Sequence, residues 1–150
     1  MTEADAHKAM FKRFITQWHT KVGGTQDAPT VPYALEDRAF TQPASPPFAQ
    51  VEITNLDGDQ ATMAKKGNRR FLRMAFFDVK LYGVRGIGRG ELDTLAGYVK
   101  ELYEAERVGD PGEAAITTYA ASPKVLRNNR EYPELRCVLV RVPFEFYERR

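Results

Sequence analysis

The chain has 150 residues, of which 43% are hydrophobic and 28% are charged, and its formal net charge is +2. This length and balance suit one globular domain and exclude an intrinsically disordered chain. No stretch approaches the ~20 uninterrupted apolar residues that cross a bilayer as a helix, so we expect no membrane segment. The acidic start, Met1 to Asp5, lacks the cationic and apolar parts of a signal peptide, which predicts synthesis in the cytoplasm.

The positive charge is concentrated in one segment. Residues 65–89 contain eight basic residues against the single acid Asp78, a net +7, which leaves −5 for the remainder of the chain. Such asymmetry indicates a surface that faces phosphates or an acidic neighbour. The candidate contact residues are Lys65, Lys66, Arg69, Arg70, Arg73, Arg85 and Arg89. A solvated turn that discourages edge-to-edge aggregation is the alternative interpretation of the same run.

The first predicted element is a helix over residues 5–20. Its apolar residues recur at spacings of three and four, which gives one face for a core. They are Met10, Phe11, Phe14, Ile15 and Trp18. His7 and His19 bracket this helix roughly 18 Å apart at the helical rise of about 1.5 Å per residue, too far to share a metal ion. We expect both histidines to be solvated.

The segment 22–47 is rich in glycine and proline and predicts an extended, arm-like connection. Only residues 31–36 have the composition of a short strand, and Pro32 confines that strand to the edge of a sheet. A region with so little core of its own is either mobile or laid against a neighbour.

From Phe48 the apolar period changes to two, which predicts strands. Residues 48–54 form a strand, residues 55–59 supply a turn, and residues 60–64 are the expected hairpin partner. A second turn at 65–68 leads into a long strand over residues 69–82. One face of that strand carries Phe71, Ala75, Phe77, Val79 and Leu81, and the apolar Leu72, Met74 and Phe76 suggest partial cover on the other.

The strongest helical pattern covers residues 91–107, with Glu91 and Asp93 near its N-terminus and Gly109 and Pro111 expected to stop it. Strands follow at 115–121 and 135–147, the second with its larger apolar residues facing one way. The chain therefore predicts a single α+β domain over residues 1–150, with a mixed or mostly antiparallel sheet and two helices packed on one face.

No catalytic or cofactor motif is complete. The glycine-rich loop 83–90 joins a strand to a helix, but it matches neither the Walker pattern nor the dinucleotide fingerprint, and Glu91 and Asp93 would repel a phosphate. We interpret it as a flexible or interface-forming loop and keep nucleotide binding as the alternative. Cys137, the only cysteine, lies in a strand pattern and is expected to be a buried structural thiol. We expect no enzyme, no metal and no cofactor.

The order of features resembles the phage tail terminator family, also called minor tail protein U-like or tail completion proteins. The likeness spans most of residues 5–147 and rests on layout and loosely matching segments: 31–38, 46–53, 67–75, the loop 83–90 and the helix start 92–96. The resemblance implies a subunit of a hexameric ring that caps the tail tube and meets the head-completion proteins. It also implies a virion location at the head-proximal end of the tail, with basic loops facing a DNA-filled lumen or the next subunit.

Two hypotheses of other classes stay open at this point. The +7 segment favours a non-specific nucleic-acid-binding module, although aromatic residues do not interleave it as they do in a dedicated single-strand binder. A nucleotide-dependent enzyme rests on the loop 83–90 alone.

Overall fold

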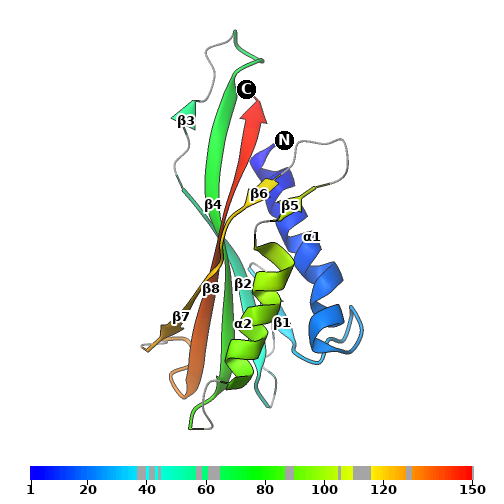
Figure 1. Cartoon of the computed structure of the whole chain (residues 1–150), viewed down its shortest axis with the longest axis vertical. Coiled ribbons are helices and arrows are strands. Elements are labelled where there is room, and N and C mark those ends of the chain that lie inside the picture. The colour runs from blue at the N-terminus through cyan, green and yellow to red at the C-terminus, as the bar shows by residue number, and fades with distance from the viewer. Residues whose placement is uncertain are drawn as a thin grey trace.

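A computed structural model of the chain describes all residues except 37–39, 41–42, 44, 57–58, 61–64, 87–89, 105, 110–115, 128–129 and 150, and it describes only the backbone of residues 59–60. Two long strands form the centre of its sheet (Figure 1). Strand β4 (Arg70–Val84) and strand β8 (Leu135–Arg149) pair antiparallel along their whole length, from Arg70 opposite Arg149 to Val84 opposite Leu135. At about 3.4 Å per residue, each is about 50 Å long.

Shorter strands extend the sheet on both sides of this pair. They are β1 (Tyr33–Leu35), β2 (Phe48–Asn55), β3 (Asp59–Gln60), β5 (Arg107–Val108), β6 (Ile116–Thr118) and β7 (Ser122–Leu126). The order is β1-β2-β4-β8-β6-β5, with β3 also along β4 and β7 also along β8. β1 runs parallel to β2 and the other described pairings are antiparallel. The mixed, mostly antiparallel sheet is as predicted, and β1 lies at its edge.

Both described helices pack on one face of the sheet, which confirms the predicted α+β arrangement (Figure 1). Helix α1 (Glu3–Val22) begins at a capping box in which Thr2 and Asp5 bond each other's backbone amides. Helix α2 (Gly90–Tyr103) lies beside it. The core joins α1 residues at every fourth position to one side of β4 and β8: Ala6, Met10, Phe14 and Trp18 with Ala75, Phe77, Val79, Leu81, Val138, Val140, Val142, Phe144 and Phe146.

The second helix is shorter than its sequence pattern predicts, because it ends at Tyr103 and not at Arg107. The side chain of Tyr103 is fully buried, and its hydroxyl donates to the carbonyl of Met10. The Thr118 hydroxyl donates to the Tyr103 carbonyl and accepts from the Glu106 amide, so a residue of β6 caps the helix end. Arg107 then enters β5, where tertiary pairing overrides the helical pattern.

The expected hairpin between residues 48–54 and 60–64 is wrong. β2 pairs with β4, with Val51 opposite Val79, and β3 continues along the same edge of β4 with Asp59 opposite Leu72. Residues 61–64 of the expected partner lie outside the described residues. Strand β7 was not predicted, because its sequence, Ser-Pro-Lys-Val-Leu, has neither clear alternation nor an uninterrupted apolar run.

The described parts of segment 22–47 contact other elements of the same chain. The Trp18 indole donates to the carbonyl of Val31 at 2.9 Å, and β1 adds to β2. Further along, the Phe40 ring lies 5.8 Å from the ring of Phe48. An arm that reaches a neighbouring subunit stays a prediction.

Candidate interaction surfaces

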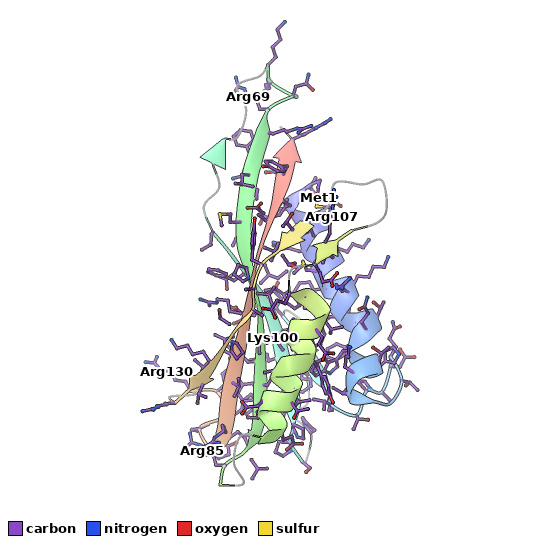
Figure 2. All side chains as sticks on the ribbon, in the orientation of Figure 1. Met1, Arg69, Arg85, Lys100, Arg107 and Arg130 are labelled. Carbon is purple, nitrogen blue, oxygen red and sulfur yellow. The ribbon has the colours of Figure 1, made fainter. Side chains whose placement is uncertain are left out.

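The basic segment does not form a single surface, because β4 runs through it. The turn before β4 and the turn after it lie at opposite ends of the sheet, as the positions of Arg69 and Arg85 show (Figure 2). Of the seven candidate residues, the structure brings together Lys65, Lys66, Arg69 and Arg70 at one end. Arg73 lies three residues farther along β4 than Arg70 and projects to the helix side of the sheet. Arg85 lies at the far end of the strand.

Arg73 and Arg85 have partners within the domain. The Arg73 Nε donates to Glu148 at 2.9 Å, and its guanidinium lies 5.4 Å from the ring centroid of Phe71. The Arg85 Nε donates to the carbonyl of Leu135 at 3.3 Å. Arg89 lies outside the described residues. The four upper residues are thus the part of the predicted basic surface that stays together.

A fifth cation joins the upper group from the other central strand. Arg149 stands directly opposite Arg70, and both project to the sheet face that the helices leave uncovered. We call Lys65, Lys66, Arg69, Arg70 and Arg149 the cationic tip; all five are exposed. Sequence reasoning missed Arg149, because only the register of two strands distant in sequence places it there.

The uncovered side of the sheet, here called the open face, carries the even-numbered residues of β4 and the odd-numbered residues of β8. Its centre is an ion pair: Arg141 donates from Nε and Nη2 to the carboxylate of Asp78, at 2.9 and 3.0 Å. Asp78 is only 2% exposed, and the Arg141 guanidinium also lies 4.4 Å from the ring centroid of Phe76. Hydrogen bonding to Asp78 raises the pKa of Arg141. The ion pair therefore neutralises the buried Asp78 carboxylate at the centre of the open face.

Above this pair, four large hydrophobic side chains are exposed close together. Leu56 is 41% exposed, Met74 40%, Tyr119 43% and Tyr147 48%. The Leu56 amide donates to the Met74 carbonyl, and Tyr119 hydrogen bonds with Glu145, which stands opposite Met74. We call these four residues the apolar patch. Exposed apolar groups gathered on one face of a sheet are typical of contact surfaces between proteins.

The lower part of the open face is covered by a small second core. Phe48, Tyr82, Leu135 and Cys137 are buried there, and Phe40, Leu126 and Tyr132 pack against them. The rings of Phe48 and Tyr82 stack at 5.0 Å. Burial raises the pKa of the Cys137 thiol to about 11. The predicted structural thiol is therefore buried and protonated at neutral pH.

The glycine-rich loop has a packing role at its start. A Cβ at Gly83 would lie 3.0 Å from the Leu92 side chain, so the missing side chain lets β4 pass close under α2. Gly86 adopts a φ of +91°, which favours glycine in the turn. Residues 87–89 lie outside the described residues. Nucleotide binding by this loop stays a hypothesis.

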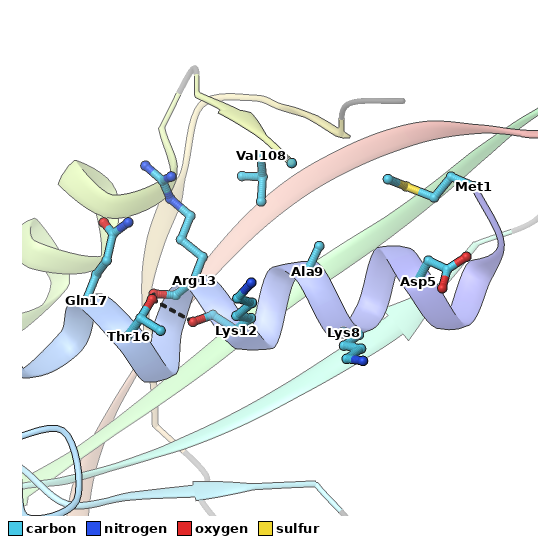
Figure 3. Close-up of a pocket in the computed structure, with 10 residues that line it drawn as sticks. Met1, Asp5, Lys8, Ala9, Lys12, Arg13, Thr16, Gln17 and Val108 are labelled. Atoms are coloured by element: carbon cyan, nitrogen blue, oxygen red, sulfur yellow. Dashed lines mark hydrogen bonds between the residues drawn. The ribbon is translucent and has the colours of Figure 1, made fainter. Parts of the chain in front are cut away.

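A shallow pocket of about 640 Å³ lies between α1 and the strand β5 (Figure 3). Its charged lining residues are Asp5, Lys8, Lys12 and Arg13. Asp5 belongs to the helix cap, where hydrogen bonds from Thr2 lower its pKa. The Arg13 Nε donates to the carbonyl of Leu102 at 2.6 Å. Two of the four charged lining residues, Asp5 and Arg13, thus already have hydrogen-bond partners within the domain.

Neither histidine belongs to a metal-binding cluster in the described part of the chain. The Nε2 of His7 lies 2.9 Å from Asn55 Oδ1, whereas Nδ1 of His19 is buried with no hydrogen-bond partner. The expectation of two solvated histidines is therefore wrong for the Nδ1 side of His19. Within the described residues, no helix is long and apolar enough to cross a membrane.

Comparison with known proteins finds likeness in structure and not in sequence. No family model matches the chain, and no curated protein matches it. One solved structure, whose name carries no functional description, has a TM-score of 0.70 and 15% identity, and the match covers 97% of this chain and 96% of that one. A chain of the "virion of native gene transfer agent (GTA) particle" has a TM-score of 0.52 and 12% identity, covering 80% of this chain and 81% of that one.

The likeness is one of fold. Identities of 15% and 12% are too low to carry residues or activities across. The matches nevertheless extend over most of both chains, so the whole domain is compared and not one common hairpin. The sheet with two helices on one face is thus an arrangement that solved proteins share.

Proposed function

We propose that this chain is a structural protein of a virion or virion-like particle. The observation that carries the proposal is the fold shared over 80% of the chain with a component of a gene transfer agent virion. The sequence layout, which resembles the tail terminator family, points to the same class of particle. The apolar patch supports it as well, because a subunit of an assembly needs an exposed surface that becomes buried on contact.

The finer proposal is a ring of identical subunits, six by the family resemblance, that ends the tail tube and joins it to the head-completion proteins. Met74 and Tyr147 project from the open face at the same end of the sheet, where a neighbouring copy has access to them. The aromatic, methionine and leucine side chains of the patch suit the buried centre of such a contact. The proposal includes no catalytic activity and no cofactor, and it places the protein in the virion tail.

Polymerising tail tubes test this role directly. The tube protein of the same particle is allowed to polymerise with and without the purified chain, and the tubes are examined by negative-stain electron microscopy. We expect the chain to sit at one tube end and to hold tube lengths to a narrow distribution. Tubes that lengthen as they do alone, with the chain left in the supernatant, would contradict the proposal.

A further inference from the structure

We propose that the cationic tip binds the phosphate backbone of nucleic acid. This inference does not depend on the structural role above, which leaves open whether the basic residues meet DNA or the next subunit. It concerns five residues at one end of the central strand pair: Lys65, Lys66, Arg69, Arg70 and Arg149.

The local backbone holds these cations at the extreme end of the sheet. The Asn68 amide donates to the Lys65 carbonyl at 3.0 Å, and Gly67 adopts a φ of +96°, so the chain reverses in a tight turn before β4. Arg70 and Arg149 form a cross-strand pair, whose Cβ atoms are about 5 Å apart in such a register. Two cationic side chains in this register are close enough for one phosphate group to contact both.

The described carboxylates near the tip hydrogen bond with other side chains. Glu148, the neighbour of Arg149, accepts a hydrogen bond from Arg73 at 2.9 Å, and these two charges cancel. Glu145 is the next described acid along β8; it stands opposite Met74 and hydrogen bonds with Tyr119. Among the described side chains, the five cations outnumber the acids at this end of the molecule. Arginine adds a planar fork of donors that fits phosphate oxygens.

The composition of the tip favours a polyphosphate over an acidic protein. Residues 65–70 read Lys-Lys-Gly-Asn-Arg-Arg and contain no apolar side chain, whereas protein interfaces have an apolar centre depleted in charge. The exposed apolar residues begin farther down the sheet, with Tyr147 and Met74. Phosphate contacts need only accessible cations, and all five residues of the cationic tip are exposed.

Binding of a labelled random-sequence DNA duplex, measured by fluorescence anisotropy from about 50 to about 200 mM salt, tests this inference. The tip variant is Lys65→Gln/Lys66→Gln/Arg69→Gln. The matched control removes three exposed cations near the β7–β8 connection instead, as Lys124→Gln/Arg127→Gln/Arg130→Gln. Both changes lower the net charge equally, and circular dichroism melts verify that both variants stay folded. Arg149→Gln, on the other strand, provides a second and independent tip variant.

We expect the wild type and the control to bind alike, and the tip variant to bind at least tenfold more weakly at the lowest salt, with a salt slope smaller by about 2 to 3. Arg149→Gln should lower the slope by about 1. Equal weakening by tip and control variants would contradict the inference, as would an absence of binding at the lowest salt. Competition by polyglutamate as effective as by DNA of the same total charge would assign the tip to an acidic protein partner and overturn it.

Discussion

Cys137 links a residue's burial to the stability of the whole domain. Its thiol lies with Tyr82 in the small core of the open face, and burial raises the pKa of both groups above their usual values. A cysteine in an unfolded chain titrates near pH ~8.5, whereas this thiol keeps its proton to about pH 11. Its alternating strand context was enough to predict burial from sequence, although the neighbouring Tyr82 was not predictable.

We expect alkaline pH to destabilise the protein. Between about pH 9 and pH 11 the unfolded chain has lost the thiol proton and the folded protein still holds it, so the folded state binds more protons and the free energy of unfolding falls as pH rises. The raised pKa of Cys137 accounts for about 2 to 3 kcal/mol of this fall. Urea unfolding across this range measures it.

Cys137→Ala is the variant for this prediction. It should cost about 1 kcal/mol near pH 8 through lost packing, and its stability should then fall less steeply above pH 9 than that of the wild type. Tyr82 and Tyr103, whose pKa values burial also raises, keep part of the slope. Parallel pH profiles for the wild type and Cys137→Ala would refute the assignment.

At the scale of elements, the contact between β4 and α2 depends on an absent side chain. Gly83→Ala should destabilise the protein by about 1 to 2 kcal/mol, because the new methyl group would press on the buried Leu92. Gly97→Ala is the control: it lies inside α2 with nothing within 4 Å of the new Cβ, and it should stabilise by about 0.5 to 1 kcal/mol. Urea unfolding midpoints compare them. A stabilising Gly83→Ala would show that the close approach is unimportant.

Sequence patterns predicted elements well where apolar residues kept one spacing over many residues and one face of the element was buried. Helix α1 and the strands β4 and β8 fit this description, because their apolar residues keep a single spacing over many residues. Local patterns failed where a distant partner decided the outcome. Thr118 caps α2 from another strand, and β2 pairs across with β4 instead of with the segment that follows it. Neither contact has a local signal.

At the scale of the whole molecule, chain proximity and spatial proximity diverge. The +7 segment reads as one basic run, but a strand about 50 Å long carries Arg85 away from Lys65 and brings Arg149 to the tip instead. The apolar patch likewise collects residues from four parts of the chain: Leu56, Met74, Tyr119 and Tyr147. Of this surface, sequence periodicity indicated only the incomplete cover on the second side of β4.

We propose that two kinds of contact share this end of the sheet: the apolar patch contacts neighbouring copies of the chain, and the cationic tip contacts phosphates. Self-assembly through the patch can be distinguished from non-specific hydrophobic association by changes at Met74. Val84, 42% exposed at the opposite end of β4, provides a matched control for the 40% exposed Met74.

Native mass spectrometry of the wild type, Met74→Glu and Val84→Glu at micromolar concentrations tests the claim most directly. We expect the wild type and Val84→Glu to form the same closed oligomer, with the mass of six copies, and Met74→Glu to remain monomeric because a buried, unpaired carboxylate opposes association. Monomers alone for the wild type, or equal assembly of all three proteins, would contradict the account.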